Sequence, residues 1–279
     1  MEINEIFSRQ IENLRITDDL LFRNVIEKGD NCLHLLQAIF PKLGIVHVDF
    51  ETQKHAKLDK HYKGSIFDVL ATDQNGRVYD IEVQTTLNSS LGKRSRYYQS
   101  NIDQQALQSG AHYKELKDSY VVFLCTGDPF GFDFKQYSFE YRCVEKPEFK
   151  LETGSQIIVI NSLGNKGEVS SSLQDFIALM NGKIKVDEDN KFINKLQKDM
   201  GYLKHDPEWR KNYMNLEMKL QDVRDEAADV ATKKEQLKSL KIIAHSLKNV
   251  GVSETEIFTQ LKQNYGKYFS DTQIRKYMN

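Results

Sequence analysis

The sequence contains little of what marks secreted, disordered or membrane-spanning proteins. Its 279 residues include only three cysteines, an odd and scattered set that favours a reducing compartment and argues against disulfides or a zinc site. Proline is also scarce, at four residues, whereas aromatic residues make up 10%, and this balance excludes general disorder. No stretch approaches the roughly 18 consecutive apolar residues of a membrane span.

Net charge is almost absent as well. The 39 Lys and Arg residues nearly cancel the 40 Asp and Glu residues and leave a formal charge of -1. This balance excludes a protein that binds nucleic acid through bulk positive charge, although it allows local basic patches. The first 22 residues carry acids and no uninterrupted apolar run, so we expect no signal or transit peptide and a cytoplasmic location.

Hydrophobic periodicity divides the chain into two regions. The first region alternates between helical and strand-like periods, whereas strand signals end beyond about residue 184. The expected order is two helices, three strands, a helix, three strands and a helix, over 17–29, 31–40, 45–52, 66–72, 77–84, 94–117, 120–125, 137–144, 156–161 and 173–180. We therefore predict an α/β core over 1–183 and an α-helical region over 184–279.

The helical region begins its longest element at Asp206-Pro207, a favourable helix start, and stays polar and helical from 208 to 247. Two short helices then follow, opened by Ser253 and Ser270. A short apolar stripe in the long helix suits a dimerisation helix, and the paired short helices loosely resemble a helix-turn-helix. We expect this region to act in homodimerisation, in DNA binding or as a specificity module.

One predicted hairpin carries the strongest chemical signal. The turn at Asn75-Gly76 joins two strand-like runs, and its length decides which side chains share a face. A two-residue loop places Asp68 and Glu82 on opposite faces, whereas a three-residue loop pairs Asp73 with Arg77 and brings Asp68 opposite Glu82. Only the three-residue loop collects the polar residues of both strands on one face, so we predict that register.

Facing carboxylates repel each other, and a divalent cation would offset that repulsion. Oxygen ligands favour Mg²⁺ or Mn²⁺ over zinc, and Gln84 points the same way as Glu82, where its amide can hold a water or a substrate oxygen. Asp80 shares this face, either as a further ligand or, as we favour, as a solvated charge. The alternative interpretation is a solvent-facing strand with scattered acids.

Five segments in order carry a family resemblance: TDDLLFRNV, FDVLATDQNGRVYDIEVQ, KRSRYYQS, ALQSGAHYKEL and YVVFLC. Together they resemble the PD-(D/E)XK nuclease superfamily, in particular its Rpn-type recombination-promoting nucleases and transposases, over about residues 15–185. The resemblance implies a restriction-endonuclease-like α/β/α core with a central mixed β-sheet, followed by an α-helical C-terminal region. It also implies metal-dependent cleavage of DNA.

Carried over by position, the resemblance makes Asp68, Glu82 and Gln84 the catalytic residues. Asp68, Glu82 and the backbone carbonyl of Val83 would hold the metal. Many members of the superfamily have Lys where this chain has Gln84, and a neutral amide orients water without helping to deprotonate it. The metal must then generate most of the nucleophile, so modest turnover is expected.

Further residues around this site are assigned more loosely. Asp19 is either an additional acid beside the metal or an acid that the dipole of its helix favours. Nucleic-acid contacts are expected from one cluster at a helix start, where cations and aromatics could grip phosphate and stack on bases: Lys93, Arg94, Arg96 and Tyr97. A second basic run, over 54–63, has the composition of a DNA-backbone contact.

Two classes of function follow. The first is a Mg²⁺- or Mn²⁺-dependent endodeoxyribonuclease linked to recombination, mobile elements or phage defence, with DNA as partner and no membrane. The second is a non-catalytic DNA-binding or assembly protein on a nuclease fold, because folds can outlive their activities.

Overall fold

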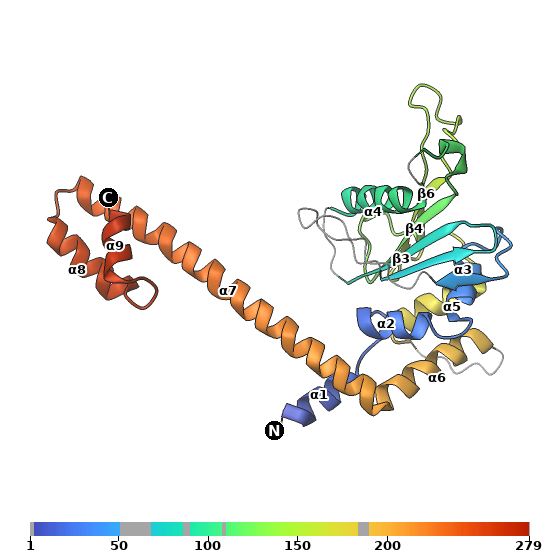
Figure 1. Ribbon diagram of the computed structural model, residues 1–279, viewed down its shortest axis with the longest axis horizontal. Coiled ribbons are helices and arrows are strands. Elements are labelled where there is room, and N and C mark those ends of the chain that lie inside the picture. Colours follow the sequence, from blue (N-terminus) through green and yellow to red (C-terminus); the bar gives the residue numbers. More distant parts are fainter. Residues whose placement is uncertain (1–2, 51–67, 86–89, 108–109, 184–189, 279) are drawn as a thin grey trace. The chain divides into compact units, whose positions relative to one another are not determined.

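The hairpin predicted to carry the chemistry lies inside a six-stranded mixed sheet of order β1-β2-β3-β4-β6-β5 (Figure 1). The computed structural model describes residues 3–50, 68–85, 90–107, 110–183 and 190–278. β3, β4 and β6 run parallel, whereas β1, β2 and β5 pair antiparallel with their neighbours. The strands are β1 (Val48–Phe50), β2 (Val69–Asp73), β3 (Val78–Gln84), β4 (Ser119–Cys125), β5 (Gln136–Phe139) and β6 (Ser155–Asn161).

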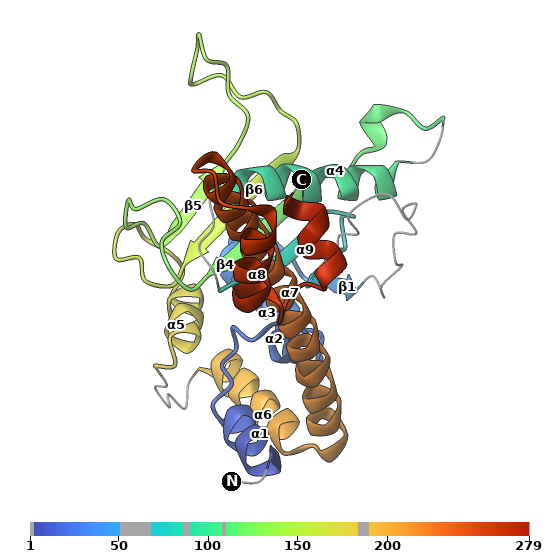
Figure 2. The ribbon, with the colours of Figure 1, turned by 90° about the vertical axis from the view of Figure 1, so that its left-hand side faces the viewer.

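Helices cover both faces of this sheet. α4 lies on one face, and α2, α3 and α5 lie on the other (Figure 1 and Figure 2). The helices of this part of the chain are α1 (Ile3–Glu12), α2 (Asp19–Ile26), α3 (Asn31–Ile39), α4 (Leu91–Ala106), α5 (Ser171–Met180) and α6 (Lys191–His205). The predicted α/β/α core with a central mixed sheet is therefore confirmed.

The register of the β2–β3 hairpin matches the three-residue turn. Val69 pairs with Ile81, and the same register continued by one residue sets Asp68 opposite Glu82. The Asp73 N–H donates to the carbonyl of Arg77 at 3.0 Å, and the Arg77 side chain forms the predicted ion pair with the Asp73 carboxylate at 3.1 Å. Asp80, Glu82 and Gln84 consequently share the face of the sheet that α4 covers.

Gly76 closes this turn with φ +77°, a backbone conformation that residues other than glycine rarely adopt. We expect Gly76→Ala to lower the free energy of unfolding by about 1 kcal/mol, because the left-handed backbone is strained by a Cβ. Gly92→Ala is the matched control, because Gly92 lies in α4 with open space around its Cβ position. That control should leave stability unchanged or raise it by up to about 1 kcal/mol in urea denaturation. Equal losses in both variants would contradict the strain at Gly76.

Several boundaries differ from the sequence prediction. α4 starts at Leu91 and ends at Ala106, and a separate 3₁₀ turn over Tyr113–Glu115 follows it, so the single helix expected over 94–117 is wrong. β5 ends at Phe139, well before residue 144, and α2 begins at Asp19, capped by Asp18, and ends at Ile26 rather than at residue 29. Gly110, at φ +87°, separates α4 from the 3₁₀ turn with a backbone conformation that a helix cannot contain.

The chain separates into two compact units, residues 1–210 and 211–279. The sequence placed the boundary at 183/184, whereas α6 packs with the first unit. The Asp199 carboxylate in α6 accepts hydrogen bonds from Asn31 at 2.9 Å and Lys195 at 3.2 Å, and pairs with Lys28 at 3.0 Å. Within the described ranges, no helix combines the length and the apolar character needed to cross a membrane.

The C-terminal region is helical, as predicted. α7 (Pro207–Asn249) begins at Pro207, where the Asp206 carboxylate accepts from the Trp209 N–H at 2.7 Å. α8 (Glu254–Tyr265) and α9 (Asp271–Met278) follow, and both predicted caps are present: Ser253 forms a capping box with Glu256, and the Ser270 hydroxyl accepts from the Gln273 N–H. Between residues 218 and 235 every side chain of α7 is exposed.

Candidate active site

The candidate site lies on β3, one of the two central strands, which carries acids on the face of the sheet that α4 covers. Six of the seven residues of β3 are buried, including Asp80, Glu82 and Gln84. In the parallel register with β4 these three lie beside Val121, Phe123 and Cys125, whose side chains pack under α4 with Leu91 and Ile102. The acids are consequently held in an apolar surrounding, which penalises their charged form.

Asp68 and Glu82 hold each other in place through the backbone. The Val83 N–H donates to the Asp68 carboxylate at 2.8 Å, and the Asp68 N–H donates to the Glu82 carboxylate at 3.1 Å. Each carboxylate therefore accepts a hydrogen bond from the strand opposite its own. The structure thus brings together the two residues that the sequence predicted as a pair.

The backbone around Val83 follows the same geometry. Even-numbered residues of β3 bond to β4, since the Val78 N–H donates to Asp118 and the Gln84 carbonyl accepts from Thr126. The N–H and carbonyl of one strand residue point to the same side, so both groups of Val83 are directed towards Asp68. This orientation suits the predicted role of the Val83 carbonyl beside the two carboxylates.

Asp80 was predicted to be a solvated charge, and this prediction is wrong. It is fully buried, and neither of its carboxylate oxygens accepts a hydrogen bond from a donor group within the described part of the chain. Its carboxyl group lies close enough to Glu82 for the two to share a proton. The hydrophobic alternation correctly placed Asp80 on the polar face, but that face is covered by α4 rather than by water.

The three acids have raised pKa values. Burial and then the negative charge of Glu82 raise the pKa of Asp68 to about 7, and the charge of Asp19 adds to this shift. Burial, followed by the charge of Glu82, raises the pKa of Asp80 well above its ordinary value. Burial also raises the pKa of Glu82, although hydrogen bonds from Asp68, Asp80 and Tyr98 act against this. The site accordingly has a high affinity for positive charge.

Arg94 supplies part of that charge. Its guanidinium donates to the Gln84 side-chain oxygen, lies 3.6 Å from the Glu82 carboxylate and donates to the Tyr98 hydroxyl at 3.0 Å. Arg94 was predicted as a phosphate contact. In this structure it contacts Tyr98 and two residues of the acid face, by which we mean Asp68, Asp80, Glu82 and Gln84. Lys93, which precedes Arg94, and Arg96, two residues after it, are both exposed. The centroid of the Tyr97 ring lies 6.5 Å from that of Tyr98.

Sequence reasoning missed Tyr98 and the burial of Asp80. Tyr98 lies four residues after Arg94, which places both on one face of α4, and this spacing could have identified it. Asp19 is exposed at the first position of α2, and its charge reaches Asp68. The predicted basic run over 54–63 lies outside the described residues.

Metal-binding groups are limited in the described part of the chain. No three His, Cys, Asp or Glu side chains there are arranged to hold a metal ion. The donor set around Asp68 is instead two carboxylates with an adjacent amide and a backbone carbonyl. It fits a hard divalent cation because all of these donors are oxygens.

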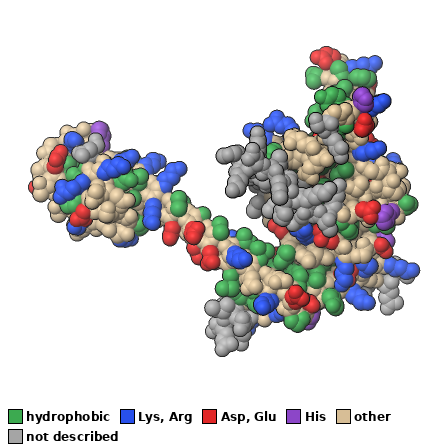
Figure 3. Space-filling view, viewed as in Figure 1, with side chains coloured by type: hydrophobic (Ala, Val, Ile, Leu, Met, Phe, Trp, Pro, Cys, Tyr) green, Lys and Arg blue, Asp and Glu red, His purple; other side chains and the backbone are tan. Residues whose placement is uncertain are grey.

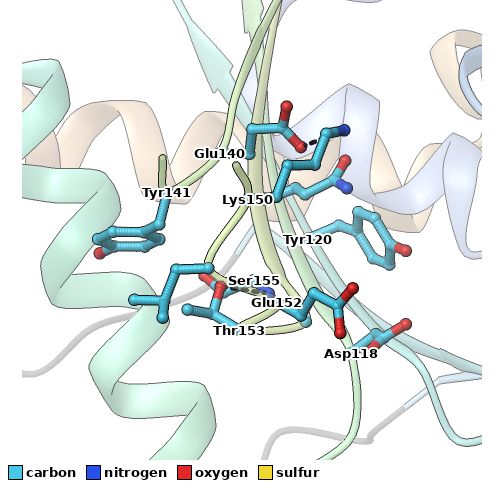
Figure 4. A pocket seen from close by; sticks show the side chains of 11 residues that line it. Asp118, Tyr120, Glu140, Tyr141, Lys150, Glu152, Thr153 and Ser155 are labelled. Carbon is cyan, nitrogen blue, oxygen red and sulfur yellow. Dashed lines mark hydrogen bonds and ion pairs between the residues drawn. The ribbon is translucent and has the colours of Figure 1, made fainter. Parts of the chain in front are cut away.

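A separate pocket of about 180 Å³ lies at the other end of the sheet, where β4 and β6 begin (Figure 4). Its lining includes Asp118, Tyr120 and Gly154, together with Glu140 and Lys150, which pair at 2.8 Å. None of the predicted site residues lines it.

Comparison with known proteins agrees with this architecture. A family model described as PD-(D/E)XK nuclease family transposase matches residues 17–238 of the chain. No curated protein and no solved structure matches the chain. The matched range contains the whole sheet, α4 and all the acids described above.

Proposed function

Because the chain belongs to the PD-(D/E)XK nuclease family of transposases, we propose that it is a Mg²⁺- or Mn²⁺-dependent endodeoxyribonuclease whose active site is the acid face under α4. The observation that carries this proposal is the pair of hydrogen bonds that holds the two acids: the Asp68 carboxylate accepts from the Val83 N–H, and the Glu82 carboxylate accepts from the Asp68 N–H. Two carboxylates held in contact inside an apolar surrounding need a cation, and a scissile phosphate can share that cation.

Asp68, Glu82 and the Val83 carbonyl would hold the metal, which when bound lowers the pKa of a coordinated water and neutralises charge on the phosphate. Gln84 orients the attacking water through its side-chain amide, because it lies two residues from Glu82 on the same face. Arg94 steadies Gln84 and Glu82 through its guanidinium and keeps a positive charge beside the phosphate position.

Asp80 supplies the acid face with a proton rather than a charge. Its carboxyl is fully buried near Glu82, and burial, followed by the charge of Glu82, raises its pKa and so favours its protonated form. A protonated Asp80 donates to Glu82 and leaves the remaining Glu82 lone pairs for a cation. Asp19, near Asp68, adds negative charge at the solvent side of the site.

Arg94→Gln is expected to shift the acidic limb of the pH–rate profile upward by about 0.5 to 1 pH unit. The positive charge of Arg94 lowers the pKa values of Asp68, Asp80 and Glu82, so its removal raises the pH at which the metal-binding carboxylates form. Cleavage rates measured from pH 5 to 9 at saturating Mg²⁺ test this. Arg224→Gln is the control, because Arg224 is exposed in α7, outside the residues assigned to the site. A shift of equal size in both variants would contradict the assigned role of Arg94.

The competing function is a non-catalytic DNA-binding or assembly protein on the same fold. Plasmid nicking and calorimetric titration with Mg²⁺ and Mn²⁺ separate the two. DNA binding without cation affinity or cleavage would favour the second function and reject the first. Homodimerisation through the C-terminal helices and a cytoplasmic location stay predictions, which analytical ultracentrifugation and cell fractionation can test.

A further inference from the structure

The near-neutral net charge hides an uneven distribution. Residues 233–279 contain nine Lys and Arg against four Asp and Glu, whereas the rest of the chain contains 30 against 36. All nine of these cations are exposed. Figure 3 shows Lys and Arg side chains spread over the surface of the C-terminal helices. The chain thus combines a positive C-terminal segment with a negative remainder.

This positive segment has a core of its own. The end of α7 packs on α8 and α9 through a cluster that is almost fully buried: Leu240, Ala244, Ile257, Leu261, Tyr265, Phe269 and Ile274. Both short helices are capped by serine side chains. The cations are therefore displayed on a packed three-helix frame rather than on a disordered basic tail.

Several cations gather around α9, and aromatic rings position them. The Lys241 ammonium lies 5.4 Å from the centroid of the Tyr277 ring, and the Lys267 ammonium lies 4.7 Å from that of Tyr268. Phe269 joins the two tyrosines, at 6.0 Å from Tyr277 and 6.5 Å from Tyr268. Residues from α7, from the α8–α9 turn and from α9 therefore place cations around one aromatic cluster.

Arg275 and Lys276 add two more charges on α9 itself. The Arg275 guanidinium lies 3.9 Å from the Phe258 ring centroid, and Lys276 is exposed beside it. The acid of this helix, Asp271, is already paired with Lys262 at 2.6 Å. We name Lys241, Lys267, Arg275 and Lys276 the α9 surface; within the described residues, none of these four forms an ion pair.

We infer that the α9 surface binds the phosphate backbone of duplex DNA. Its cations lack carboxylate partners that phosphate would have to displace, so binding gains the release of condensed counterions. Its tyrosines pack against Phe269 and lie under lysines, which makes them supports for the cations rather than open stacking platforms. Phosphate contacts without stacked bases favour a duplex over a single strand.

This surface deepens the proposed function and rests on it for the choice of DNA as ligand. Because α7 links the two units covalently, DNA held by the α9 surface stays at a high effective concentration for the rest of the chain. Binding at this surface needs no divalent cation and no acid from the β2–β3 hairpin. Its failure can thus be separated from a failure of the nuclease proposal.

The test measures fluorescence anisotropy of a labelled duplex of about 30 base pairs with the full chain in EDTA, from about 50 to 200 mM salt. The α9 triple variant is Lys241→Gln, Arg275→Gln and Lys276→Gln. The control triple is Lys198→Gln, Lys211→Gln and Lys219→Gln, which removes the same charge from exposed positions elsewhere. We expect the α9 triple to bind about 10- to 100-fold more weakly at low salt, with a salt slope smaller by about 2 to 3.

Three outcomes would overturn the inference. Equal weakening in both triples would show a general charge effect, and an unchanged affinity and salt slope in the folded α9 triple would show that DNA lies elsewhere. If the α9 triple loses binding to phosphatidylserine vesicles but keeps its affinity for the duplex, the surface contacts membranes instead. An Asp68→Asn chain that binds the duplex normally but does not cleave it supports the inference independently of the wild-type cleavage activity.

Discussion

Asp68→Asn and Glu82→Gln are each expected to reduce DNA cleavage by at least roughly 10³-fold, because each removes one carboxylate charge from the proposed metal site. Both substitutions keep the shape of the side chain, so the hairpin should remain paired. Nicking of supercoiled plasmid with Mg²⁺ and with Mn²⁺ gives the rates, and calorimetry gives the accompanying loss of cation affinity.

The control for these variants is Asp222→Asn, which removes an exposed carboxylate from α7 and should cleave at the wild-type rate. Circular dichroism establishes that each variant is folded. Near-wild-type cleavage by folded Asp68→Asn or Glu82→Gln protein would remove the site from the β2–β3 hairpin. Cation affinity that survives in both variants would place the metal on other residues.

The second large effect concerns stability against pH. An acid whose pKa is raised in the folded state binds more protons there than in the unfolded chain, so the free energy of unfolding falls as pH rises. For Asp68 the window runs from its ordinary pKa of 3.8 to about 7. Without divalent cation, we expect the first unit to lose about 2 kcal/mol of stability across this window, a value discounted because Asp68 is partly exposed.

Asp80→Asn tests the same effect by removing a buried acid while keeping its size. The variant should be more stable than wild type by about 1 to 2 kcal/mol at pH 8 in EDTA, and the gain should shrink towards pH 4. Urea denaturation at several pH values measures this, with Asp229→Asn on exposed α7 as the matched control. A gain in stability of Asp80→Asn that is equal at pH 4 and at pH 8 would contradict the raised pKa of Asp80.

The register of the hairpin was predictable because two local signals agreed. The alternation in residues 77–84 defined a polar face, and the Asn75-Gly76 turn allowed only two loop lengths. Asp73 reinforces this choice, since its carboxylate accepts from the N–H groups of Asn75 at 2.8 Å and Arg77 at 3.0 Å. A register that depends on neighbouring residues in this way can be predicted from the sequence.

The burial of Asp80 and the role of Tyr98 depend on α4, whose packing no local pattern encodes. Alternation tells which side chains share a face, but it does not tell whether water or a helix covers that face. The same limit explains the misplaced end of α4, because helical periodicity alone did not reveal that the residues after Ala106 leave the sheet. The family match covers the sheet and α4 together.

The long α7 has a thermodynamic consequence. Its segment from 218 to 235 has no buried side chain, so side-chain packing on this segment does not couple the unfolding of the two compact units. A helix without tertiary contacts melts and reforms on its own, and cooperativity does not pass through it. We therefore expect the sheet with its buried acids and the basic three-helix core to unfold in separate transitions, of which only the first responds to divalent cations.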